Sequence, residues 1–176
     1  MTGNNLKYLI AVLNSKPCAW VFKTFYAGGG LGSEGIRYKK VFLEQLPVPQ
    51  ISLADQQPFI EKAQKMLDLT KQLNSLSFTF LDYLKAKMGN QSKLSNKLLK
   101  WYNLPDDAFL TEINKLAKAE KLANFDERAV FVAFKTDSKK IKEIQQALAN
   151  TDAEIDRAVY DLYKLSEEEI GVVENL

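Results

Sequence analysis

The sequence predicts a mainly helical α+β protein with long antiparallel helices and a small strand and loop element near residues 26–50. Two observations favour this class. Apolar residues recur at spacings of three and four over most of the chain. The one segment that breaks this pattern holds five of the eight glycines within residues 28–35. We therefore expect two domains, residues 1–53 with the glycine-rich loop and residues 54–176 as a helical spacer and bundle.

The first elements are short. Asn5 can cap a helix that runs to about Ser15, with an apolar face formed by Leu6, Leu9, Ile10 and Leu13. Pro17 suits the first turn of a second helix over residues 19–25. After the glycines, residues 36–38 favour a short strand. Residues 40–46 favour a helical turn that buries Val41, Phe42 and Leu46, and the two prolines that follow, Pro47 and Pro49, require extended backbone.

Longer helices follow. Ser52 or Asp55 can cap a helix with Pro58 in its first turn, and we expect a separate helix over residues 78–88. Residues 90–96 read as a loop, and residues 98–102 and 108–119 as short helices. Residues 126–134 have strand propensity at Val130-Phe131-Val132 but helical flanks, so we expect helix there.

The last long helix has the clearest pattern. From Ser138, an apolar stripe follows heptad spacing through Ile141, Ile144, Leu148, Thr151, Ile155, Ala158 and Leu162. Two interpretations remain open, a core-facing helix of a bundle or an antiparallel helix pair that acts as a spacer. A final helix over residues 166–174 begins with a capping box, Ser166 followed by Glu169.

Composition excludes several classes of function. The chain has 176 residues, no histidine and one cysteine, Cys18, so a zinc site is nearly excluded and histidine base catalysis is impossible. Cys18 has no histidine partner that could activate it as a nucleophile. We expect no membrane partner, because no apolar run approaches the roughly 20 residues of a membrane span. The single cysteine and the absence of a visible signal peptide favour the cytoplasm.

The glycine-rich segment matches neither of two nucleotide-binding motifs. A P-loop ends in Gly-Lys-Ser/Thr, whereas Ile36 and Arg37 follow Gly35 here. A dinucleotide-binding turn requires a preceding strand, whereas residues 18–26 favour helix. The segment instead suits contact with a polyanion, because glycine allows close backbone approach and cations follow it. The alternative is an exposed hairpin or linker. The candidate DNA-binding residues are Gly29, Gly30, Ser33, Arg37, Tyr38, Lys39 and Lys40.

Charge is spread unevenly along the chain. Residues 1–50 carry six Lys/Arg against two Asp/Glu, residues 51–125 eleven against eight, and residues 126–176 seven against twelve. Polyanion contact is therefore expected in the first two thirds. A second basic set has no acid between Asp82 and Asp106. It comprises five lysines (Lys85, Lys87, Lys93, Lys97, Lys100) with Tyr83, Trp101 and Tyr102 among them. The alternative is that the lysines lie on solvated helix faces and the aromatic residues anchor the core.

Several segments in a fixed order resemble a known family. They are residues 5–16, the glycine-rich loop, residues 36–40, Leu43-Glu44-Gln45-Leu46-Pro47-Val48-Pro49, residues 56–60 and residues 155–170. Together they resemble the C-terminal part of the TaqI-like specificity domain of adenine-specific DNA methyltransferases, which occurs in type IIG restriction–modification proteins. The Leu-Pro-Val-Pro stretch before a long helix also resembles type I specificity subunits. The resemblance is strong at residues 5–60 and 152–174 and weak at residues 76–135.

The resemblance implies a function in recognising double-stranded DNA. A separate upstream domain of the same polypeptide would bind S-adenosylmethionine and transfer the methyl group, since this chain has neither the methyl-donor motif nor the Asn-Pro-Pro-Tyr-type motif. We therefore expect no enzymatic activity and no cofactor in this chain. It reads as a fragment in which the first half of the recognition domain is missing. The alternative is a helical protein-interaction module that docks on the methyltransferase or nuclease domain, with little DNA contact.

Overall fold

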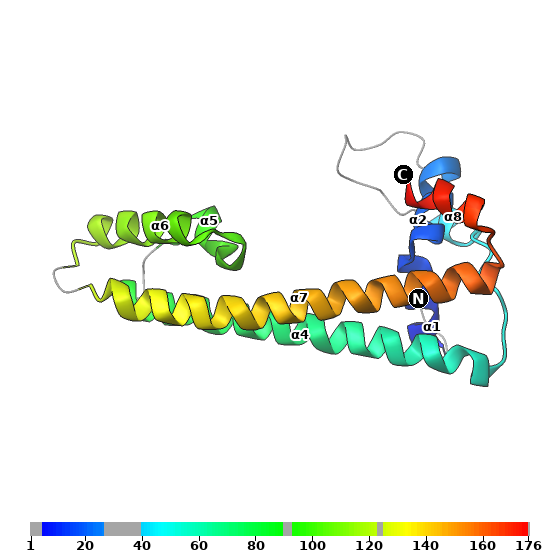
Figure 1. Cartoon of the computed structure of the whole chain (residues 1–176), viewed down its shortest axis with the longest axis horizontal. Coiled ribbons are helices and arrows are strands. Elements are labelled where there is room, and N and C mark those ends of the chain that lie inside the picture. The colour runs from blue at the N-terminus through cyan, green and yellow to red at the C-terminus, as the bar shows by residue number, and fades with distance from the viewer. Residues whose placement is uncertain (1–4, 27–39, 90–92, 123–124, 176) are drawn as a thin grey trace. The chain divides into compact units, whose positions relative to one another are not determined.

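The computed structural model describes residues 5–26, 40–89, 93–122 and 125–175, and most of these residues lie in helices (Figure 1). The structure is 82% helical with no strand among these residues, which confirms a mainly helical fold. The strand predicted at residues 36–38 lies outside the described residues. In chain order the elements are α1 (Leu6–Asn14), α2 (Lys16–Val21), the π-helix η1 (Phe22–Tyr26), α3 (Lys40–Leu43), α4 (Leu53–Met88), α5 (Asn96–Leu99), the 3-10 helix η3 (Trp101–Asn103), α6 (Asp106–Ala119), α7 (Glu127–Tyr163) and α8 (Glu167–Glu174).

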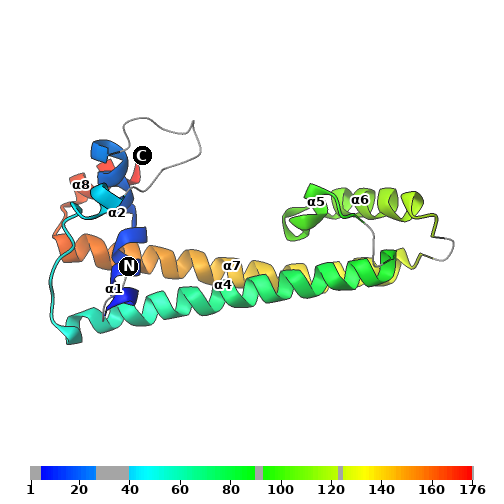
Figure 2. The same cartoon turned by 180° about the vertical axis from the view of Figure 1, so that it is seen from behind.

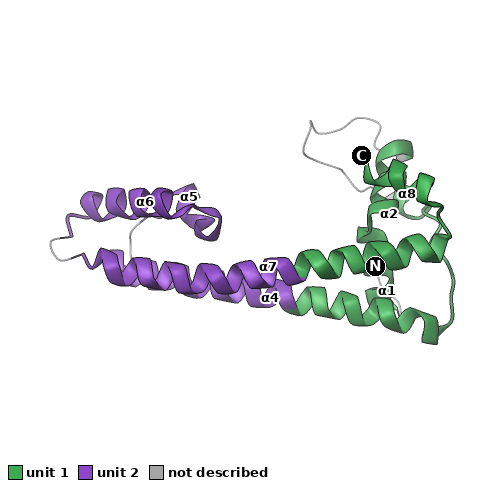
Figure 3. Ribbon diagram, viewed as in Figure 1, with its two compact units in different colours: residues 1–68, 148–176 green, residues 69–147 purple. Residues whose placement is uncertain are grey.

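The chain divides into two compact units (Figure 3). Unit 1 combines residues 1–68 with residues 148–176, and unit 2 is the continuous stretch 69–147. Helices α4 and α7 contribute to both units. Within each unit they lie side by side and antiparallel, as the front and back views agree (Figures 1 and 2). The sequence predicted a single boundary along the chain, between residues 53 and 54, whereas unit 1 combines two separate stretches. The predicted boundary is not tested by this division and stays a prediction.

Both long helices are longer than the sequence pattern indicated. Residues 53–88 form one helix of 36 residues, so the separate helix expected at residues 78–88 is wrong. The stretch 74–77 does not break the helix because it contains neither glycine nor proline, and Ser77 is buried within unit 2. Helix α7 likewise runs through the strand-prone Val130-Phe131-Val132. Val130 and Phe134 are both buried one turn apart, and this packing outweighs the local strand propensity.

The start of α4 differs in detail from the expectation. Ser52 Oγ accepts a hydrogen bond from the Asp55 backbone N–H at 3.2 Å, so Ser52 is the residue that caps. Pro58 lies inside the helix rather than in its first turn. The capping box at the other end of the chain is confirmed, because Ser166 and Glu169 exchange both side-chain-to-backbone hydrogen bonds at the start of α8.

The core of unit 2 is aromatic. Phe109 of α6 stacks on Phe134 of α7 with ring centroids 3.8 Å apart and planes within 7°. Phe80 of α4 lies 3.9 Å from Trp101, whose indole N–H donates to the Ser77 carbonyl at 3.4 Å. All four rings are at most 1% exposed. Around them pack Leu84, Met88, Leu98, Ile113, Val130 and Ile141.

Unit 1 has a separate core, in which the start of α4 packs on the end of α7. Its buried members include Val12, Phe22, Phe59, Ala63, Ile155 and Val159. The face predicted for α1 is wrong at Leu6 and Ile10, which are exposed, whereas Leu9 and Leu13 are half-buried. The residues that the helix buries are Tyr8, Ala11 and Val12. The helix is rotated so that the aromatic Tyr8 packs edge-on against Phe59. Of the turn after residue 40, Leu46 is buried, Phe42 is half-buried and Val41 is exposed, contrary to expectation.

The predicted stripe on α7 faces inward. Ile141, Thr151 and Ile155 are buried, and Ile144, Leu148, Ala158 and Leu162 are half-buried. This arrangement is compatible with both interpretations, the core-facing helix and the antiparallel pair. In each unit α7 faces a core, and in each unit it lies antiparallel to α4. None of the described helices is both long and apolar enough to cross a membrane.

Candidate functional site

Most predicted DNA-binding residues fall outside the described residues. This is the case for Gly29, Gly30, Ser33, Arg37, Tyr38 and Lys39, which lie within residues 27–39. Lys40 begins α3, but its side chain is not described either. What the structure describes is the part of unit 1 on which this segment begins and ends.

The two ends of the segment are tied together by an aromatic contact. Phe22 of η1 precedes the segment and Phe42 of α3 follows it, and their rings meet edge to face at 6.5 Å. Phe22 is fully buried in the core of unit 1. Trp20 and Phe25 form a second edge-to-face pair at 6.0 Å on the same side of the segment. The described residues before position 27 and after position 39 are therefore in contact with each other through Phe22 and Phe42.

The extended stretch around Pro47 and Pro49 is held by two hydrogen bonds from tyrosines of distant helices, here called the tyrosine clamp. Tyr163 of α7 donates its hydroxyl proton to the Pro47 carbonyl at 2.7 Å. Tyr8 of α1 donates to the Pro49 carbonyl, also at 2.7 Å. Among the described residues no backbone N–H donates to the Pro47 or Pro49 carbonyl, and these side-chain donors satisfy both carbonyls. Burial raises the pKa of both tyrosines, which keeps them protonated as donors.

We expect Tyr163→Phe to remove one of these clamps without changing the packing of the ring. The loss of one hydrogen bond to a carbonyl should cost about 1 kcal/mol of unfolding free energy. Thermal unfolding followed by circular dichroism measures it. Tyr102→Phe in unit 2 is the control, because the Tyr102 hydroxyl has no protein partner within the described part of the chain. Equal shifts in both variants would mean that the Pro47 contact contributes nothing.

A polar network joins α2, α7 and α8 beside this clamp. The buried carboxylate of Asp156 accepts a hydrogen bond from the Lys16 backbone N–H at 2.8 Å and so caps α2 from another helix. The Lys16 ammonium pairs with Glu174, which also accepts from the Tyr160 hydroxyl at 2.6 Å. Burial raises the pKa of Asp156, while the hydrogen bond from Lys16 lowers the pKa of Glu174. Each of these contacts holds one helix to another.

Cys18 is structural rather than reactive. It lines a small apolar cavity of about 90 Å³ in unit 1, together with Val21, Leu46, Leu165 and Val173. Burial raises the pKa of the thiol to about 11. The nucleophilic thiolate is therefore scarce at neutral pH.

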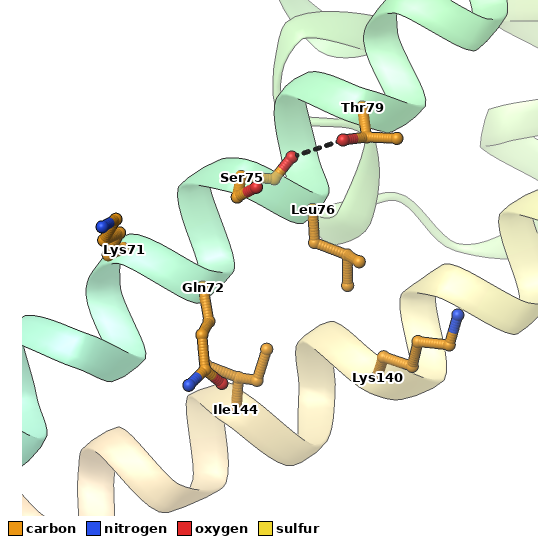
Figure 4. A pocket seen from close by; sticks show the side chains of 7 residues that line it. All are labelled: Lys71, Gln72, Ser75, Leu76, Thr79, Lys140 and Ile144. Atoms are coloured by element: carbon orange, nitrogen blue, oxygen red, sulfur yellow. Dashed lines mark hydrogen bonds between the residues drawn. The ribbon is translucent and has the colours of Figure 1, made fainter.

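A second hollow lies on unit 2 between α4 and α7 (Figure 4). It is an open groove of about 420 Å³, and Figure 4 shows Leu76 of α4 and Ile144 of α7 pointing toward one another. The hydroxyl of Thr79 donates to the Ser75 carbonyl of its own helix at 2.9 Å. The Lys140 ammonium is paired with Asp137 at 3.0 Å. Two of the polar groups that line the groove, Thr79 and Lys140, are thus engaged with neighbours on their own helices.

Across residues 5–26, 40–89, 93–122 and 125–175, no three His, Cys, Asp or Glu side chains are placed to share a metal ion. The second basic set is also different from a stacking surface. Trp101 is fully buried and Tyr83 and Tyr102 are half-buried, so the aromatic residues among its lysines are core anchors.

Sequence reasoning missed the clamp and the polar network. The hydrogen bond between Tyr163 and Pro47 joins residues 116 apart, and that between Lys16 and Glu174 joins residues 158 apart. Helical periodicity reports only on neighbours within a few turns. The one local signal was that Asp156 and Tyr163 lie on the same face of α7 as the buried Val159.

The fold and these contacts define a helical protein whose described polar contacts in unit 1 join its helices to one another. The chain belongs to the family described as a domain of unknown function, DUF8810, whose model matches residues 52–159. The match begins just before α4, covers all of unit 2 and ends within α7. Neither a curated protein nor a solved structure matches the chain.

Proposed function

We propose that this chain is a non-catalytic DNA-recognition module of a restriction–modification methyltransferase. The observation that supports it is the composition of unit 1. The resemblance to TaqI-like specificity domains is strong at residues 5–60 and 152–174, two segments far apart in the sequence. Both lie in unit 1, which combines residues 1–68 and 148–176, and the weakly similar residues 76–135 lie in unit 2.

In this proposal unit 1 presents residues 27–39 to duplex DNA. The contact between Phe22 and Phe42 fixes both ends of the segment, and the tyrosine clamp fixes the stretch behind it. Glycine at positions 29 and 30 allows the backbone to approach a groove, with Ser33 and Tyr38 available for polar contact. Three cations, Arg37, Lys39 and Lys40, neutralise phosphates and set the register.

The module acts as part of a longer polypeptide. An upstream methyltransferase domain in the cytoplasm supplies S-adenosylmethionine binding and methyl transfer, and a nuclease domain can accompany it. This chain contributes no catalytic residue and no cofactor site of its own.

A protein-interaction module is the second candidate. The surface of α8 favours it, because Glu167 and Glu168 are exposed and Val172 is 58% exposed beside them. An acidic surface repels DNA but suits a protein partner. Co-purification of this chain with the adjoining methyltransferase domain, compared between wild type and Val172→Glu, distinguishes the two candidates. Loss of the complex without loss of DNA affinity would favour this second function.

The loop assignment predicts a change in salt dependence. Replacement of Arg37, Lys39 and Lys40 by Ala in the parent protein should lower the magnitude of the slope of log affinity against log salt by about 0.9 for each lost phosphate contact. Fluorescence anisotropy with a labelled duplex at several salt concentrations measures it. The control removes three exposed lysines elsewhere in unit 1, Lys7, Lys65 and Lys164. A slope equal to that of the control would remove the loop from the interface.

The isolated chain should bind duplex DNA weakly and with little regard to sequence. Its net charge is only +2, and the acidic excess at residues 126–176, twelve Asp/Glu against seven Lys/Arg, opposes DNA. We expect dissociation constants in the non-specific range, roughly 10⁻⁴ to 10⁻⁶ M, and no methyl transfer. Competition titrations with varied duplexes test this. A preference of about a thousandfold for one sequence would mean that recognition is complete in these 176 residues.

A further inference from the structure

We propose that unit 2 carries a second, sequence-independent contact surface for the phosphate backbone of duplex DNA. Its members are five lysines at the end of α4 and around α5, here called the lysine set: Lys85, Lys87, Lys93, Lys97 and Lys100. This inference rests on the proposed DNA-binding function, but it assigns a surface separate from residues 27–40.

The first support is the distribution of charge between the units. Unit 2, residues 69–147, holds fourteen Lys/Arg against nine Asp/Glu, a balance of +5. Unit 1 holds the remaining ten against thirteen, a balance of −3. The unit that resembles a recognition domain is therefore net acidic, and the excess positive charge lies in unit 2. A polyanion is attracted to a locally basic surface even where the net charge of the whole chain is small.

The second support is the exposure of the lysines. Lys87, Lys93, Lys97 and Lys100 are all exposed, and Lys85 is half-buried. Within the described part of the chain, Lys93 and Lys100 have no carboxylate within 4.0 Å. The sequence supplies no acid between Asp82 and Asp106. These ammonium groups are thus available to replace the condensed counterions of DNA.

Among the described residues, the acid that pairs with a member of the lysine set is Glu112, and it is already compensated. Glu112 of α6 lies 3.8 Å from the Lys97 ammonium and 3.3 Å from that of Lys115, and it accepts a hydrogen bond from Ser95 at 2.9 Å. Two cations therefore share one carboxylate, which leaves the local balance positive and brings Lys115 of α6 next to Lys97.

The aromatic residues decide which nucleic acid fits. Proteins that bind single strands stack bases on exposed rings. Here Trp101 is fully buried between Phe80 at 3.9 Å and Phe134 at 6.0 Å, and Tyr83 is half-buried against Phe80. The Tyr83 ring is also covered by the set itself, because the Lys87 ammonium lies over it at 5.7 Å from the centroid. The lysine set therefore offers cations for phosphates rather than a fully exposed ring for stacking bases. The chemistry therefore favours the backbone of a duplex.

A membrane surface is a poorer fit. Membrane-bound amphipathic helices present a continuous apolar face opposite their cations. Across described residues 85–89 and 93–103, Leu99 at 49% is the exposed large apolar side chain. One such side chain does not make an insertion surface.

The test compares three triple variants of the full chain: Lys93, Lys97 and Lys100 to Gln, the loop residues Arg37, Lys39 and Lys40 to Ala, and the control Lys7, Lys65 and Lys164 to Gln. All lose three positive charges. Binding to a labelled duplex is measured by anisotropy across a salt series. The Lys93/Lys97/Lys100 variant should lower the magnitude of the salt slope by about 0.9 for each lost contact and by more than the control does.

The outcomes separate this inference from the proposed function. A reduced slope for the Lys93/Lys97/Lys100 variant with an unchanged loop variant would support the lysine set and reject the loop. A slope equal to the control would overturn the lysine set whatever the loop variant does. Tighter wild-type binding to a single strand than to a duplex would also overturn it. The lysine set would also be overturned if this variant lost binding to phosphatidylserine vesicles while its DNA salt slope stayed unchanged. That result would assign the lysines to a membrane.

Discussion

Replacement of Ile155 by Asp should destabilise the protein more than most single substitutions. The side chain is 6% exposed and lies in the core of unit 1, on the inward stripe of α7. An aspartate there would bury a carboxylate with no cation described among the core residues around it. The cost of an unpaired buried charge is about 3–5 kcal/mol. Thermal unfolding should show a fall of roughly 6–20 °C in the midpoint for a chain of this size.

The matched control for that variant is Ala153→Asp on the same helix. Ala153 is exposed, and Arg157 stands four residues later, a spacing that favours an acid–base pair. We expect a change within about 0.5 kcal/mol. If both variants unfold at the same temperature, the stripe does not bury Ile155.

Replacement of Phe80 by Ala should have a comparable effect on unit 2. Phe80 is 1% exposed and contacts Trp101 at 3.9 Å and Phe109 at 6.0 Å. Truncation removes the ring and leaves a cavity lined by aromatic side chains that cannot collapse easily. Phe→Ala changes in cores cost about 3–5 kcal/mol. Chemical denaturation followed by tryptophan fluorescence reports on this site directly, because Trp101 is a neighbour of the lost ring.

Phe78 provides the control two positions away on α4. It is 66% exposed, so Phe78→Ala removes the same atoms without opening a core. We expect a shift within about 0.5 kcal/mol. A loss of stability at Phe78 as large as that at Phe80 would mean that an additional partner covers the outer face of α4.

Much of the fold could be predicted from local patterns, and the failures have physical causes. The capping box at Ser166 and the inward stripe of α7 depend only on residues within a few turns, and both are confirmed. The face of α1 was wrong because Leu6 and Ile10 are more apolar than Tyr8, yet Tyr8 finds both Phe59 and the Pro49 carbonyl. Helix continuity at residues 74–77 was missed because tertiary burial of Ser77 is invisible to propensity.

Less of the candidate site could be predicted. The glycine-rich and basic segment is conspicuous in the sequence, but nothing local indicates what holds it. The described residues on either side of it make contacts that no local pattern indicates: Phe22 meets Phe42, and Tyr8 and Tyr163 reach proline carbonyls from other helices. Such contacts between distant residues require the tertiary fold. The lysine set was visible as a run without acids, whereas its aromatic neighbours could be assigned to the core only from the structure.

The way unit 1 is assembled has a consequence for the order of folding. Its core joins α1 and the start of α4 to the end of α7, and its polar network links Lys16 to Glu174. Contacts of such long range close slowly because most of the chain must first be ordered between them. Unit 2 is one continuous stretch of local helix–helix contacts. During synthesis we therefore expect unit 2 to fold first. We expect the apolar faces of α1 and α2 to remain exposed, and accessible to chaperones, until the end of α7 and α8 have left the ribosome.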